Sequence, residues 1–95
     1  MTAVCVKGSL RIRVEGISSL KEKRSIVSRT KNVLTRMYQI SIIESHDQNA
    51  LVYIGLSLSY ISHNRSEAQQ RWDKILSELE KQTGGWLETE ESQMF

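Results

Sequence analysis

Six cationic side chains and one tyrosine are of the types, and lie at the spacings, that suit contact with a phosphate backbone. Lysine and arginine neutralise phosphates and release condensed counterions, whereas an aromatic ring on an open sheet can stack on an unpaired base. A single ring favours shape- and phosphate-directed contact over base-specific reading, because RNA-recognition domains commonly present two or three rings. The candidate RNA-binding residues are Lys7, Arg11, Arg13, Lys21, Lys23, Arg24 and Tyr53.

Three of these cations crowd the start of a predicted helix. Ser19 is placed to accept a hydrogen bond from the amide of Glu22, and the Glu22 carboxylate can reach back to the Ser19 amide, as in a capping box. A helix N-terminus carries partial positive charge, so the three cations stand where cations are disfavoured and a role other than helix stability is indicated. A solvated, lysine-rich face is the alternative explanation. The segment reads Ser19-Leu20-Lys21-Glu22-Lys23-Arg24.

Residues that could support catalysis or metal binding are few and scattered. A cysteine two residues before a lysine can have a reactive thiol. A catalytic nucleophile also needs a nearby base, however, and the sequence places none beside this cysteine. Two distant histidines and one aspartate form an incomplete metal-ligand set. We therefore expect a protein that is not an enzyme and that uses no metal or cofactor. The residues concerned are Cys5, Lys7, His46, Asp47 and His63.

Length and composition predict one small domain that spans residues 1–95, with 39% hydrophobic and 25% charged side chains. The single cysteine, a start without a secretory pattern and the lack of an apolar run near the roughly 20 residues of a membrane span favour a cytoplasmic protein. Residues 1–47 hold nine Lys or Arg and four Asp or Glu, a net charge of +5. The remainder holds four cations and seven acids, a net charge of −3.

Hydrophobic periodicity predicts six elements. Alternation of apolar and polar residues indicates strands, and apolar steps of three and four residues indicate amphipathic helices. Asn64 followed by Glu67 repeats the capping signature, and Gly84-Gly85 predicts the end of the second helix. The predicted elements are a strand over 4–14, a helix of about 18 residues from Leu20, a strand over 38–44, a strand over 52–60, a helix from Asn64 to Gly84, and a strand over 86–91.

The order strand, helix, strand, strand, helix, strand is that of a ferredoxin-like α+β fold. In this two-layer sandwich the first and third strands are central in an antiparallel sheet, and both helices cover one sheet face. The other face stays open and meets water or a partner. The side chains expected on it are Lys7, Ser9, Arg11, Arg13, Tyr53, Ser57 and Ser59.

The chain resembles the YlxP-like family of small bacterial proteins of unknown function. The resemblance is carried by the basic first strand, the segment Ser19 to Arg24, a hairpin containing His46, Asp47 and Gln48, and the short second helix. It implies a ferredoxin-like fold, and the family's genes often lie near those of ribosome-maturation and translation-initiation factors. The hairpin here departs from the family's usual longer, aromatic-containing hairpin.

Two functions follow from these observations. The favoured one is a non-enzymatic protein that contacts structured RNA or ribosomal particles through its basic surface. The alternative is a homodimeric interaction module without nucleic-acid binding, prompted by the open sheet face and the apolar Met94-Phe95.

Overall fold

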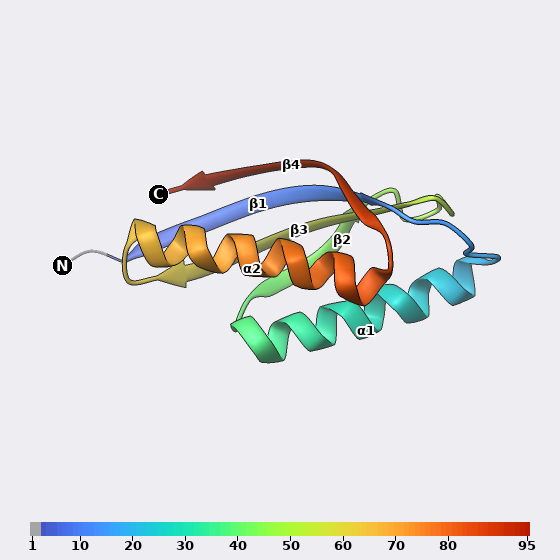
Figure 1. Ribbon diagram of the computed structural model, residues 1–95, viewed down its shortest axis with the longest axis horizontal. Coiled ribbons are helices and arrows are strands. Elements are labelled where there is room, and N and C mark those ends of the chain that lie inside the picture. Colours follow the sequence, from blue (N-terminus) through green and yellow to red (C-terminus); the bar gives the residue numbers. More distant parts are fainter. Residues whose placement is uncertain (1–2) are drawn as a thin grey trace.

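The computed structural model describes residues 3–95 and contains the six elements in the predicted order (Figure 1). The fold is a ferredoxin-like α+β sandwich. Its elements are β1 (Val4–Arg13), α1 (Leu20–Tyr38), β2 (Ser41–His46), β3 (Tyr53–Ser62), α2 (Arg65–Thr83) and β4 (Trp86–Met94).

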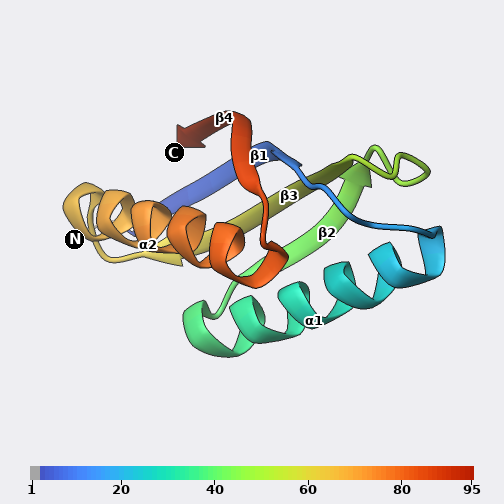
Figure 2. The ribbon, with the colours of Figure 1, turned by 45° about the vertical axis from the view of Figure 1, so that its right-hand side comes forward.

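The four strands form one sheet in the order β2-β3-β1-β4, and every pair of neighbours is antiparallel. The two central strands are the two with long apolar alternation, as predicted. Both helices lie on the same side of this sheet, which leaves the other side uncovered (Figures 1 and 2). A sheet with one covered face requires side chains of alternating polarity, and the two central strands supply them.

The core lies between the sheet and the helices, and Trp72 of α2 is the largest side chain buried in it. The Trp72 ring approaches β1 at Gly8, where an added Cβ would stand 2.3 Å from Cη2 of the ring. Gly8 therefore stands in the apolar row of β1 because the Trp72 ring comes close to the backbone there, and not because the strand has a bulge at this residue. The irregularity in the pairing of β1 with β4 lies further along, between Arg11 and Ile12.

The structure corrects the predicted start of the second strand. The first helix continues to Tyr38, and β2 begins only at Ser41. Gln39 ends the helix in the left-handed conformation with φ of 52°. Arg71 of α2 donates to the carbonyls of Tyr38 and Gln39, so a contact from a distant element satisfies the end of α1. The last strand is also longer than predicted and extends to Met94.

Tyr60 of β3 gives the fold a measurable pH dependence. Its side chain is buried, and its hydroxyl donates to the carbonyl of Ala68 over 2.8 Å. Burial raises the pKa of Tyr60 from 10.0 to about 12. Because the native state then holds this proton more tightly than the unfolded state does, the contribution is complete below about pH 10 and is lost as the pH rises toward 12.

We expect the free energy of unfolding of the wild type to fall by about 1 kcal/mol more than that of Tyr60→Phe between about pH 9 and pH 11. Urea unfolding of both proteins at the two pH values measures this difference, since all other titrating groups are shared. Parallel pH profiles would contradict the assignment to Tyr60.

Candidate nucleic-acid interface

Strand pairing determines which face each side chain of β1 takes. Lys7 lies opposite Ser59 and Arg13 lies opposite Tyr53, while the intervening Leu10 and Ile12 are buried under the helices. The polar residues of β1 therefore point away from the helices, as predicted. We call this side of the sheet the open face; it carries Cys5, Lys7, Ser9, Arg11, Arg13, Ser41, Ile43, Tyr53, Ser57, Ser59, Ile61, Glu91, Gln93 and Phe95.

The ring of Tyr53 is already occupied by two arginines. The guanidinium carbon of Arg11 lies 3.7 Å from the ring centroid, and that of Arg13 lies 5.5 Å from it. Arg13 also donates to the Tyr53 hydroxyl over 3.3 Å. A ring stacked by a guanidinium cannot offer that same surface to a base, so the structure gives Tyr53 an intramolecular partner in place of a free stacking face.

Arg11 is neutralised by the hairpin between β2 and β3. Its Nε and Nη2 donate to the two carboxylate oxygens of Asp47 over 3.0 and 3.1 Å. This bidentate bond raises the pKa of Arg11 above its ordinary value. Asp47 adopts a turn conformation, with φ of 57°, and its carboxylate holds Arg11.

Lys23 is buried, which corrects the expectation that it stands beside Lys21 and Arg24 on a solvated face. Its side chain is only 1% exposed. Its Nζ donates to the backbone carbonyl of Asp47 and lies 3.4 Å from Oε2 of Glu44. A phosphate cannot reach an ammonium group enclosed in this way, so Lys23 joins α1 to the hairpin instead.

The helix cap forms largely as predicted. Ser19 Oγ accepts a hydrogen bond from the amide of Glu22 over 3.1 Å. The Glu22 carboxylate reaches back one residue further than expected and accepts from the hydroxyl and the amide of Ser18, over 2.7 and 3.2 Å. These bonds lower the pKa of Glu22, so it stays ionised at the positive end of the helix. Of the segment from Ser19 to Arg24, only the cations Lys21 and Arg24 are left without such a structural role.

A row of cations runs along the solvent side of α1. Among the ion pairs within 4 Å in the described part of the chain, residues 3–95, none involves these side chains. Four of the five are exposed and one is half-buried. Three of them were not among the predicted site residues. Of these, Lys31 lies at the edge of the buried stripe, and Arg29 also donates to the carbonyl of Gln82 over 2.9 Å. This α1 cationic face consists of Lys21, Arg24, Arg29, Lys31 and Arg36.

Three serine hydroxyls and a histidine form a chain of hydrogen bonds across the open face. Ser9 Oγ lies 2.9 Å from Ser57 Oγ, and Ser57 Oγ lies 2.7 Å from Ser45 Oγ. Ser45 Oγ lies 2.8 Å from Nδ1 of His46, whose ring rests on Gly55. The sequence carried no signal for this cluster, because its members come from three strands. Its polar groups satisfy one another, so it ties β1, β3 and β2 together.

The residues considered for catalysis or metal binding do not come together in the structure. Cys5 is an exposed free thiol on the open face. Within residues 3–95, no three histidine, cysteine, aspartate or glutamate side chains gather as a metal ion would require. No helix of the described chain is long and apolar enough to span a membrane.

Comparison with known proteins finds a family and a fold. Residues 6–91 match the family described as "Protein of unknown function (DUF503)". No curated protein matches the chain. Among solved structures, a structural-genomics protein YJCS is similar with a TM-score of 0.53 at 11% identity, over 94% of this chain and 96% of that one. The de novo designed protein Foldit4 is similar with a TM-score of 0.50 at 15% identity, over 99% and 97% of the two chains. At these identities the likeness concerns the fold alone.

Proposed function

Since the chain belongs to the DUF503 family, whose function is unknown, we propose from its geometry that it is a non-enzymatic protein that binds structured RNA, such as that of ribosomal particles, through the α1 cationic face. The observation that carries this proposal is the row of five cations on one helix without an acidic partner in residues 3–95. We also propose that the protein is cytoplasmic and that it is similar to the YlxP-like proteins, as the sequence predicts.

The position of the first two cations supports binding over helix stability. Lys21 and Arg24 lie in the first turns of α1, where the helix dipole disfavours positive charge. The one acid of this turn, Glu22, is held by Ser18 and does not pair with either cation. Side chains that cost helix stability and make no ion pair are best explained by a partner that supplies negative charge.

The length and composition of the face fit a phosphate backbone. Lys21 and Arg36 are fifteen residues apart, so the row spans roughly 22 Å at 1.5 Å per residue. Serine, threonine and asparagine lie between the cations and can donate to phosphate oxygens. Contacts of this kind read the shape of an RNA helix and not its sequence.

The open face adds charge, but its Tyr53 ring is covered by Arg11. Arg11 is held by Asp47 and covers Tyr53, so an unpaired base finds no uncovered face on that side of the ring. Lys7 is exposed on the open face and can add a phosphate contact of its own. Double-stranded or folded RNA is therefore the better substrate than a single strand.

Binding of labelled RNA over a range of salt concentrations tests the proposal. We expect a 20-base-pair RNA duplex to bind more tightly than a single strand of the same length, with log K falling linearly with log salt at a slope of roughly −3 to −5. Co-sedimentation with ribosomal subunits at low and physiological salt then tests the particle as the partner. No duplex binding at low salt would refute the proposal.

A further inference from the structure

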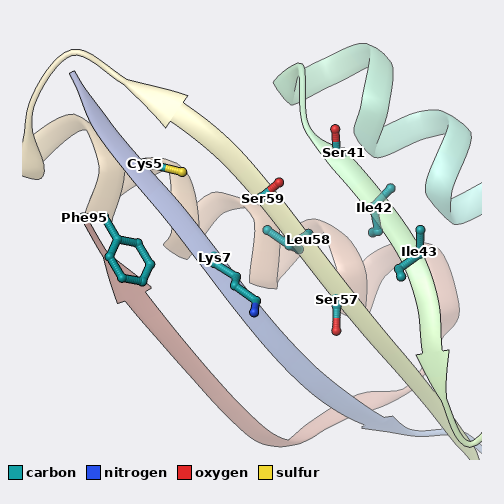
Figure 3. A pocket seen from close by; sticks show the side chains of 9 residues that line it. All are labelled: Cys5, Lys7, Ser41, Ile42, Ile43, Ser57, Leu58, Ser59 and Phe95. Atoms are coloured by element: carbon teal, nitrogen blue, oxygen red, sulfur yellow. The ribbon is translucent and has the colours of Figure 1, made fainter.

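An apolar hollow lies on the open face, on the far side of the sheet from α1. It is an open hollow of about 390 Å³, lined by residues of β1, β2 and β3 and by Phe95 just after β4, with Ile43 of β2 on one side and Phe95 on the other (Figure 3). Between them lie small side chains of β1 and β3, including Cys5 and Ser59. Lys7 is the one charged residue in the lining.

Large apolar side chains stand exposed around this hollow. Phe95 is 68% exposed, Ile61 is 67% exposed and Ile43 is 60% exposed. Single exposed hydrophobic residues are ordinary on a protein surface, but three on one sheet face beside a hollow mark a surface that another molecule covers.

The Phe95 ring is presented by a fixed backbone. The amide of Phe95 donates to the carbonyl of Cys5 over 2.8 Å, and the amide of Cys5 donates to the carbonyl of Phe95 over 3.0 Å. This pair of bonds extends the ladder between β1 and β4 past Met94. With the backbone already fixed, only the rotamer freedom of the side chain is lost when the ring enters a pocket, so Phe95 suits a role as an anchor.

We propose that the open face binds a second copy of this chain, with Phe95 of each copy entering the hollow of the other. The same molecule offers both the anchor and the pocket, side by side on one surface. A two-fold axis parallel to β1 brings each anchor over the other copy's pocket, which is the self-complementary arrangement of an isologous dimer.

The size of the face is sufficient for such a dimer. Ten-residue central strands and four strands in the sheet give a footprint of roughly 600 Å², at about 3.3 Å per residue and 4.8 Å between strands. Because side chains project from the sheet, the accessible area of the face is larger than this footprint. It approaches the roughly 800 Å² that each partner buries in a stable complex.

The charges of the face fit a second copy as well. Lys7 stands on β1 and Glu91 stands on the neighbouring β4, opposite Ser9. A face that carries charges of both signs avoids the repulsion that two copies of a face of one sign would meet. RNA fits this patch poorly, because its lining is apolar and includes a single cation.

Sedimentation equilibrium of the full chain, up to several hundred micromolar, tests the proposal. The wild type is expected at twice the 10.9 kDa chain mass, and Phe95→Glu is expected at the monomer mass. Met37→Glu is the matched control, because Met37 is 53% exposed on α1 and the same charge is added outside the open face. Ile43→Glu provides a second variant within the face.

The Cys5 thiol supplies an independent readout, since it lines the hollow. Its reaction with a chromogenic disulfide should slow several-fold as the wild-type concentration rises, and this dependence should vanish in Phe95→Glu. A wild type that stays monomeric leaves the face to another protein or an apolar ligand and overturns the proposal. A Phe95→Glu variant that remains dimeric overturns it too. The α1 cationic face lies on the other side of the sheet, so duplex binding per chain at low salt should survive in this variant.

Discussion

Replacing Lys23 by methionine is expected to lower the free energy of unfolding by about 3 kcal/mol. The substitution removes the buried ammonium group that contacts the Asp47 carbonyl and the Glu44 carboxylate. Oε2 of Glu44 is buried and accepts no hydrogen bond within residues 3–95, so its charge would be left unpaired in a poorly solvated place. Urea unfolding followed by circular dichroism measures the loss.

The neighbouring lysine provides the control for this prediction. Lys21→Met removes the same side chain from the exposed side of the same helix, and we expect a change within about 0.5 kcal/mol. Adding Glu44→Gln to Lys23→Met should recover at least half of the lost stability, because it removes the stranded charge. Equal losses in Lys21→Met and Lys23→Met would show that the buried pair does not link α1 to the hairpin.

Replacing Lys21 and Arg24 together by glutamate is expected to weaken duplex RNA binding at least about 10-fold at low salt and to make the slope of log K against log salt shallower by about 2. Both side chains are exposed, lie on the α1 cationic face and make no ion pair within residues 3–95, so the change removes phosphate contacts without breaking the fold. Fluorescence anisotropy with the labelled duplex at several salt concentrations gives both quantities. Lys23 is left intact, because its replacement would lower the stability of the fold for a different reason.

A charge-matched variant distinguishes binding at the α1 cationic face from attraction by the overall charge of the protein. Lys74→Glu with Lys81→Glu makes the same change in net charge on exposed positions of α2. We expect this variant to retain most of the affinity, with a small loss from long-range electrostatics at low salt. If the two double variants bind equally weakly, the RNA is attracted by overall charge and the α1 cationic face is not the binding surface.

Local patterns were enough to predict the architecture. Alternation along β1 and β3 placed Lys7, Arg11 and Arg13 on the open face, because a period of two leaves no other choice once one face is buried. Caps at Ser19 and Asn64 started both helices, and Gly84 with φ of 72° ended the second. The boundaries of β2 were less accurate, since the contact between Arg71 and the end of α1 comes from a distant element.

The environment of each charge was not predictable from local patterns. Lys23 lies four residues before Val27, on the buried stripe of α1. The helical period therefore indicated that Lys23 is buried, whereas its charge indicated that it is exposed. What resolves this conflict is the hairpin, whose Glu44 and Asp47 reach the ammonium group from more than twenty residues away.

The sequence by itself determined the element order, the two-layer sandwich and the face that each strand residue takes, because these depend on short-range periodicity. Only the tertiary structure decided that Lys23 and Arg11 are neutralised within the chain, whereas Lys21 and Arg24 make no ion pair within residues 3–95. The physical reason is that a charge is paired or free according to the position of its partner. That position is set by strand register and loop conformation far along the chain.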